Sequence, residues 1–167
     1  MFTGLKIPKL IRWIFWTGII FLFGMILLRL AFYFSCTPSG EPPGIPGKAF
    51  LLGFRFDLKM VCILLEAMLI IGFLFKPDPF RSAAGRKAEF VLLGFASAFF
   101  TFFYIVDFAH YSYLTQRLSA SVLNYLQDAG ISLDMVWQTY PVIRLLLAWA
   151  IGSLFLFWLV KKSFRAV

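Results

Sequence analysis

The chain has few of the residues that soluble enzymes use for chemistry: its 167 residues include two cysteines, one histidine and eight acidic residues. Cys36 and Cys62 lie far apart and form no C-x-x-C motif, so neither a disulfide framework nor a metal site is indicated. The sequence contains no glycine-rich phosphate loop and no zinc-binding pattern. We therefore expect no cofactor in this chain and no catalysis by this chain alone.

Charged residues are also scarce, at 14%, whereas 61% of residues are hydrophobic and 20% are aromatic, including 22 Phe. A water-soluble core cannot use that much apolar surface, so the composition predicts a polytopic membrane protein. The formal net charge of +8 does not indicate a nucleic-acid partner, because the basic residues stand in short clusters beside apolar runs. We interpret these clusters as topology signals and expect membrane lipids as partners.

Four apolar runs are each long enough to cross about 30 Å of hydrocarbon at about 1.5 Å per residue. They predict an all-α, polytopic membrane helix bundle, with a single membrane domain over residues 1–167. The four transmembrane helices are expected at about residues 10–34, 57–75, 89–111 and 141–160. Apolar residues then recur every three or four positions over about residues 112–138, which predicts interfacial amphipathic helices on the outer side.

The distribution of Lys and Arg orients these spans. In this topology ten of the sixteen basic residues fall on one side of the membrane, and six fall on or near the other. Because cytoplasmic loops are enriched in Lys and Arg, we expect both termini in the cytoplasm. The proline- and glycine-rich residues 36–48 are expected to form a non-helical outer loop, and residues 76–87 a basic inner loop.

A charged sequence, Gly53-Phe54-Arg55-Phe56-Asp57-Leu58, stands at the mouth of the second predicted span. Arg55 and Asp57 are two residues apart, so on a helix they point to different faces and need other partners. The candidates near the outer interface are Arg29, Arg117 and Arg144 for Asp57, and Asp107 for Arg55. These residues form either ion pairs that fix helix order or a pocket for an anionic lipid headgroup, since Arg suits bidentate phosphate contacts.

His110 is the only histidine and follows Asp107 by three residues. With no nucleophile nearby, we interpret it as a hydrogen-bonding anchor rather than a catalytic base. Together these side chains form what we call the outer polar cluster: Arg55, Asp57, Asp107, His110, Arg117 and Arg144.

Small and polar residues follow one face of the third span, which is expected to look into the bundle. This face comprises Gly94, Ser97, Thr101, Tyr104, Asp107 and Tyr111. Glu66 lies near the middle of the second span, at about the depth of Ser97 and Thr101 on an antiparallel neighbour. Two roles are open for Glu66: a structural hydrogen bond to a hydroxyl, or a proton or ion relay.

Three further features concern packing. Ala148 and Gly152 form a small-x-x-x-small step in the last span, which predicts close contact with another helix. Trp13 and other aromatic residues near span ends are interpreted as interface anchors. Cys62 is interpreted as a small apolar filler.

Short motifs in the chain resemble a known family. The stretch Gly53-Phe54-Arg55-Phe56-Asp57-Leu58, followed by Asp107-Phe108-Ala109-His110-Tyr111-Ser112-Tyr113 and Arg117-Leu118, is similar to the N-terminal membrane domain of bacterial lipoteichoic-acid-synthase-like proteins. These are phosphoglycerol or phosphoethanolamine transferases of the alkaline phosphatase and sulfatase superfamily. The resemblance covers most of the chain and implies a location in the bacterial inner (cytoplasmic) membrane.

The resemblance implies a membrane domain of about five helices that carries an extracytoplasmic catalytic domain, where a metal-bound Thr takes a headgroup from a phospholipid. This sequence ends at Val167 after four predicted spans, so we expect a fragment of a longer chain or a reduced relative. The catalytic domain and its divalent metal are then absent, and no catalytic or metal-binding residue of the family can be assigned. The implied function is to anchor and position a lipid-headgroup transferase at the outer leaflet.

Two other functions stay open. One is a small transporter or channel subunit that uses Glu66 and the polar face of the third span. The other is a non-catalytic membrane scaffold subunit, which is favoured if the outer polar cluster is fully engaged in internal pairs. Replacing Glu66 by Gln separates anchor from carrier, because only a proton- or ion-coupled carrier is expected to lose its activity.

Overall fold

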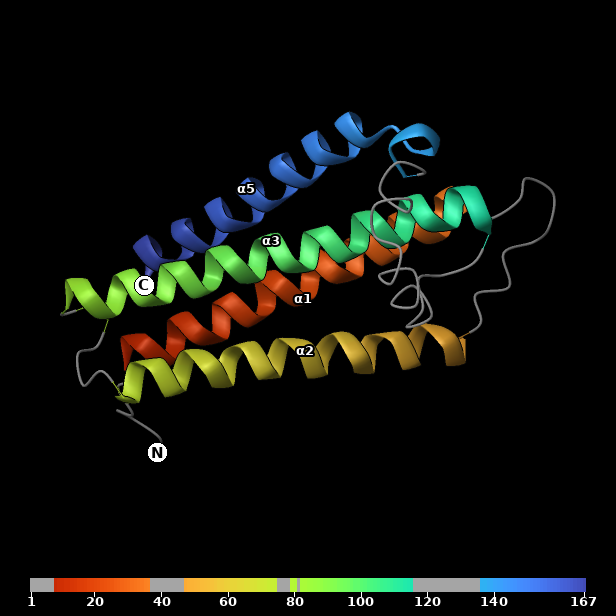
Figure 1. Cartoon of the computed structure of the whole chain (residues 1–167). Coiled ribbons are helices and arrows are strands. Elements are labelled where there is room, and N and C mark those ends of the chain that lie inside the picture. The colour runs from red at the N-terminus through yellow and green to blue at the C-terminus, as the bar shows by residue number, and fades with distance from the viewer. Residues whose placement is uncertain (1–7, 37–46, 75–78, 81, 116–135) are drawn as a thin grey trace. The chain divides into compact units, whose positions relative to one another are not determined.

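The computed structural model describes residues 8–36, 47–74, 79–80, 82–115 and 136–167. Four long helices make up most of these residues: α1 (Lys9–Cys36), α2 (Gly47–Leu74), α3 (Ala83–Leu114) and α5 (Val142–Ala166) (Figure 1). No strand occurs in these five described ranges. The predicted all-α class is confirmed.

Three segments of these helices are long and apolar enough to cross a membrane: Lys9–Ser35, Ala83–Ser112 and Val142–Ala166. Large apolar side chains on all three are exposed, among them Phe34, Phe95 and Ile151. Helices that are apolar all round need lipid or other protein around them, so the chain is a membrane-embedded helical protein. α2 differs because it carries five charged residues, and a fourth span through α2 stays a prediction.

The N-terminal boundaries of α2 and α3 differ from the predicted ones. α2 begins at Gly47, ten residues before the predicted start, so Arg55 and Asp57 lie inside the helix rather than at its mouth. α3 begins at Ala83, so Arg86 and Lys87 belong to the helix and not to a loop. The prediction used charged residues to mark the start of each helix. However, α2 has 28 residues and is about 42 Å long, which exceeds the thickness of the hydrocarbon layer. Its charged part has room to project beyond that layer.

The segment predicted to be interfacial begins later than expected, because residues 112–114 continue α3. The helix ends where Thr115 adopts a φ of 54° and donates its N–H to the Tyr111 carbonyl at 2.8 Å, a left-handed C-terminal cap. Residues 136–139 form one helical turn before α5, closed by a 2.9 Å bond from the Tyr140 N–H to the Val136 carbonyl. Residues 116–135, which hold most of the predicted interfacial helices, lie outside the described residues.

The chain divides into two compact units. The first contains residues up to Ala96 together with residues from Phe155 onward, and the second contains Ser97–Leu154. The first unit therefore holds α1, α2, the start of α3 and the end of α5. The second unit holds the remainder of α3 and α5.

In the first unit α1 and α2 lie side by side and run antiparallel (Figure 1). Close contacts at glycines set their register, with Gly18 beside Leu65 and Gly72 beside Leu10. A Cβ atom at Gly18 would lie 2.8 Å from Leu65 Cδ1, so the absence of a side chain lets the Leu side chain reach the α1 backbone. The buried apolar side chains of this pair include Phe21, Met25, Val61, Leu64 and Met68.

An aromatic cluster closes the end of the first unit where α1 begins. The Trp13 ring, with no exposed surface, makes edge contacts with Phe80, Phe90 and Phe164 at centroid distances of 6.1, 6.1 and 4.9 Å. Phe80 and Phe164 stack at 4.4 Å. Trp13 is therefore a core residue, and its interpretation as an interface anchor is wrong. Sequence position could not show this, because the three partner rings come from distant parts of the chain.

The second unit joins α3 and α5 by close packing at Gly152. A Cβ atom at Gly152 would lie 2.8 Å from Thr101 Cγ2, so the predicted close contact is confirmed at Gly152, whereas Ala148, the other small residue of the step, is exposed. The Trp149 indole N–H donates to the Ala98 carbonyl at 2.8 Å, and its ring lies edge-on to Phe102. These contacts fix the rotation of α5 against α3 within the unit.

Candidate functional site

The central feature of the candidate site is an ion pair between α1 and α2. The Arg29 guanidinium donates two hydrogen bonds to the Oδ2 atom of Asp57, from Nη2 at 2.7 Å and from Nε at 3.2 Å. The side chains are 18% and 9% exposed, so solvent screens the pair only weakly. Arg29 was one of three predicted partners for Asp57, and that pairing is confirmed. The pair stabilises the antiparallel register of α1 and α2.

Gly53 makes this geometry possible. A Cβ atom built at Gly53 would lie 1.5 Å from Arg29 Nη1 and 2.3 Å from its Cζ. The guanidinium therefore lies directly against the α2 backbone, one turn before Asp57. Any side chain at position 53 must displace Arg29. The charges of this motif carry the sequence prediction, but the glycine is what lets the Arg29 guanidinium lie against α2.

Arg55 lies on a different face of α2 from Asp57, as the two-residue spacing predicts. Asp57 is buried, whereas Arg55 is exposed and makes no hydrogen bond or ion pair within the described part of the chain. Lys48 and Lys59 are exposed on α2 as well. The ion pair neutralises Asp57, so this part of α2 presents net positive charge to its surroundings.

The other members of the outer polar cluster lie outside the first unit. Asp107 and His110 are half-buried on α3, and Arg144 is exposed near the start of α5. Arg117 lies outside the described residues. The predicted pairing of Arg55 with Asp107 joins residues of different units and stays a prediction.

The polar face of α3 is buried at its middle. Ser97 has no exposed surface and Thr101 is 6% exposed, while Tyr104 is half-buried. Glu66 is exposed on α2 and makes no hydrogen bond to any other described residue. The face of α3 therefore looks inward, as expected, whereas Glu66 points away from the packed side of α2.

Glu89 is a buried acid that sequence reasoning missed. Its side chain has no exposed surface, and neither carboxyl oxygen has a hydrogen-bond partner among the described residues. A Cβ atom at Gly72 would lie 3.8 Å from Glu89 Oε1, so the carboxyl reaches the seam between α1 and α2. The signal in the sequence is an acid isolated beside Arg86 and Lys87, but the predicted helix starts at Glu89, which makes this residue a helix boundary instead of a buried position.

Two uncharged polar groups on α1 are also buried without a hydrogen-bond partner among the described residues. The Trp13 indole nitrogen and the Thr17 hydroxyl are buried and have no hydrogen-bond partner within the described ranges. Trp13 and Thr17 are one helical turn apart, so they lie on the same face of α1. Buried polar groups are normally satisfied, which marks this end of the first unit as a place where water or an ion would be favourable.

A protein metal site is not formed by the described residues, since no three of their His, Cys, Asp or Glu side chains come together. Comparison with family models, with curated proteins and with solved structures finds no match to the chain. The site must therefore be interpreted from its own chemistry. That chemistry is a neutralised carboxylate beside exposed cations on one helix, with a buried carboxyl on another.

Proposed function

We propose that this chain is the membrane-anchoring and positioning domain of a lipid-headgroup transferase, of the phosphoglycerol or phosphoethanolamine class. The observation that supports this most is the Arg29–Asp57 pair, because it leaves Arg55 as an exposed cation on α2. An exposed guanidinium at the edge of a membrane suits bidentate contact with a phosphate diester. The resemblance of the Gly53–Leu58 stretch to lipoteichoic-acid-synthase-like proteins supports the same class.

The proposal has a defined topology. α2 crosses the membrane as a fourth span, both termini lie in the cytoplasm, and the membrane is a bacterial inner membrane. The first part of α2 and the end of α3 then reach the outer leaflet, where Asp107, His110 and Arg144 add to the outer polar cluster. A catalytic domain in the same longer chain would carry the divalent metal and the reaction, while this domain holds the headgroup within its reach.

The test measures binding of a short-chain, fluorescent phosphatidylglycerol to the purified chain in uncharged detergent micelles. Arg55→Gln is expected to weaken binding about fivefold, since one basic residue at an anionic lipid surface contributes about 1 kcal/mol. Lys87→Gln is the matched control, because it removes the same charge from an exposed position at the opposite end of the bundle. Equal losses in both variants would show a general charge effect and contradict the proposal.

A small transporter is the second candidate, and buried polar groups on α3 favour it. Glu89, Ser97 and Thr101 are all buried, and their four- and eight-residue spacings place them on one side of the helix. An ionisable group inside a membrane helix is by default a functional candidate. In proteoliposomes with an internal pH-sensitive dye, a carrier is expected to lose proton flux in Glu89→Gln and to keep it in Lys87→Gln. The absence of any flux through the native chain would rule this function out.

A further inference from the structure

A narrow charged stripe runs along the exposed side of α2. Lys48, Arg55, Lys59 and Glu66 fall within about 40° of one another around the helix, at about 100° per residue. All four are exposed, and none makes a hydrogen bond or ion pair within the described residues. Asp57 points to the opposite side, toward Arg29. The helix therefore has one face that packs on α1 and another that presents unpaired charge.

The two deeper residues of the stripe are the unusual ones. Lys59 and Glu66 are seven residues apart, or about 10 Å along the helix, too far to pair with each other. Glu66 lies about 12 Å from the C-terminal end of α2. If α2 crosses the membrane, as proposed above, Glu66 lies near the middle of the hydrocarbon layer. A carboxyl at that depth is unfavourable against lipid tails and needs a polar partner.

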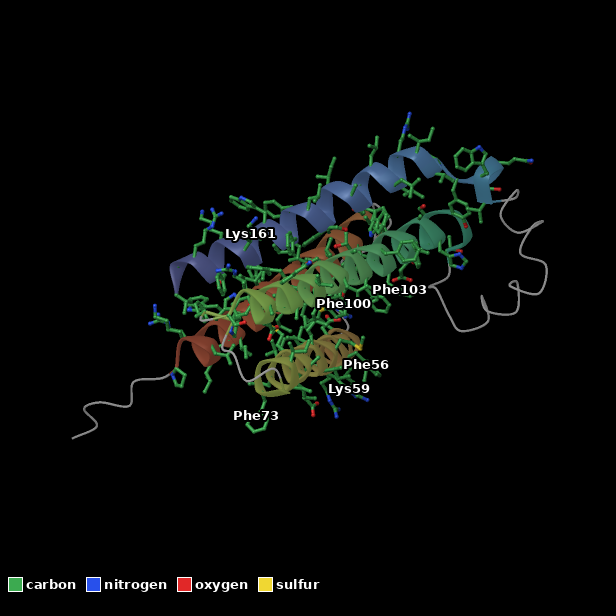
Figure 2. The ribbon with its side chains drawn as sticks, turned by 60° about the vertical axis from the view of Figure 1, so that its left-hand side comes forward. Phe56, Lys59, Phe73, Phe100, Phe103 and Lys161 are labelled. Atoms are coloured by element: carbon green, nitrogen blue, oxygen red, sulfur yellow. The ribbon has the colours of Figure 1, made fainter. Side chains whose placement is uncertain are left out.

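The surroundings of this pair are apolar and exposed. Ile63 is 52% exposed, Ile70 is 50% exposed and Phe73 is 86% exposed. Figure 2 shows Lys59 and Phe73 projecting outward from the α2 ribbon. An exposed apolar strip that contains one cation and one acid two turns apart has the pattern of a helix-binding surface, with side chains that select the partner.

We propose that this face of α2 binds a membrane helix of a partner protein that carries an acidic residue opposite Lys59 and a basic residue opposite Glu66. Lipid does not fit the pattern, because phospholipids offer only phosphate near the surface and hydrocarbon at the depth of Glu66. A second copy of this chain does not fit either. Two-fold symmetry about the membrane normal would place Lys59 near Lys59 and Glu66 near Glu66, so like charges would face one another.

Arg55 and Lys59 divide the stripe by depth. Arg55 lies one turn nearer the N-terminal end of α2 and serves the headgroup role proposed above, while Lys59 and Glu66 serve the partner helix. Cys62 lies between Lys59 and Glu66 and is a free, exposed cysteine, so its interpretation as a small filler is wrong. Its thiol is a natural probe of whether this face is covered.

The test uses the full chain with Cys36→Ser, reconstituted in phosphatidylcholine vesicles, and follows alkylation of Cys62 by the carbene of a membrane-soluble diazirine, which needs no thiolate. Two synthetic Leu/Ala membrane peptides of identical composition are added. The first has Lys at its centre, to face Glu66, and Glu seven residues away, to face Lys59. The second exchanges the two. Because one charge is central in each peptide, inserting a peptide in the opposite direction does not interchange the two patterns.

The first peptide is expected to slow alkylation, with an affinity at least about tenfold higher than that of the second. In the doubly substituted Lys59→Glu/Glu66→Lys chain this preference is expected to reverse, which a folding defect could not produce. Equal protection by both peptides, protection without any peptide at raised chain density, or protection by phosphatidylglycerol alone would each overturn the proposal. If α2 does not span the membrane, a water-soluble maleimide is expected to label a Glu66→Cys variant. That result would count against the proposed function as well.

Discussion

Replacing Gly53 by alanine is expected to separate Arg29 from Asp57. The new Cβ atom would lie 1.5 Å from Arg29 Nη1 and 2.3 Å from Cζ, so the guanidinium must move out of its position against α2. That movement breaks the 2.7 and 3.2 Å bonds to Asp57, and hydrogen bonds of charged groups contribute about 1.5–3 kcal/mol each. Alanine favours the helix over glycine by about 1 kcal/mol, which offsets part of the loss. We expect a net loss of about 1–2 kcal/mol, since the partly exposed guanidinium can still find polar partners.

The assay is reversible unfolding of the purified chain in mixed micelles by added SDS, followed by far-UV circular dichroism. Gly47→Ala is the matched control, because a Cβ atom there would meet nothing within 4 Å, and its effect is expected to stay within about 0.5 kcal/mol. The decisive arm repeats Gly53→Ala in an Arg29→Ala background. With no guanidinium to displace, the alanine at position 53 is expected to stabilise the chain by up to about 1 kcal/mol.

The decisive result is the change in sign of the Gly53→Ala effect on stability between the native chain and the Arg29→Ala background. A Gly53→Ala substitution that destabilises the chain equally with and without Arg29 would mean that the glycine serves backbone packing and not the ion pair. A substitution that stabilises the native chain would mean that Arg29 does not lie against α2. Either result would refute the geometry from which the positive charge of this surface was inferred.

Three further substitutions test other contacts in the same unfolding assay. Gly152→Ala is expected to cost about 1–3 kcal/mol by overpacking against Thr101 Cγ2, and Thr101→Ser, which removes that methyl group, is expected to restore most of the loss; a null effect would contradict the close contact. Glu89→Leu is expected to be neutral or to stabilise by about 1–2 kcal/mol, more than Glu89→Gln, whereas strong destabilisation would reveal a partner for the carboxyl. Trp149→Phe is expected to cost about 1 kcal/mol through loss of the bond to the Ala98 carbonyl, and an unchanged midpoint would show that this bond is dispensable.

Helix class and approximate positions could be predicted because apolar run length depends only on local sequence. The start of α2 could not be predicted, since charges such as those of Arg55 and Asp57 normally mark a membrane boundary. In the structure the carboxylate of Asp57 is neutralised by Arg29 from another helix, which allows a charged sequence to continue as a helix. A charge at the edge of a membrane does need a partner, as the prediction assumed. Which of the candidate arginines pairs with Asp57 depends on tertiary packing, and the structure gives Arg29.

The candidate site was predictable in part. The two-residue spacing of Arg55 and Asp57 was enough to place them on different faces, because helical geometry decides that alone. The role of Gly53 was not predictable, since it depends on the register of α1 against α2. The burial of Glu89 was hidden for a similar reason: Arg86 and Lys87, shortly before it, are exposed and basic, whereas its carboxyl reaches Gly72 on a different helix.

The proposed function depends most on the placement of the first turn of α2 and the last turn of α3 at the same outer surface of a membrane. Cysteine accessibility in intact cells tests this directly, using Lys48→Cys, Ser112→Cys, Lys87→Cys and Lys162→Cys in a chain whose own two cysteines are replaced by serine. A water-soluble maleimide is expected to label positions 48 and 112 in intact cells, and positions 87 and 162 only after permeabilisation. Labelling of positions 48 and 112 from opposite sides would contradict the account.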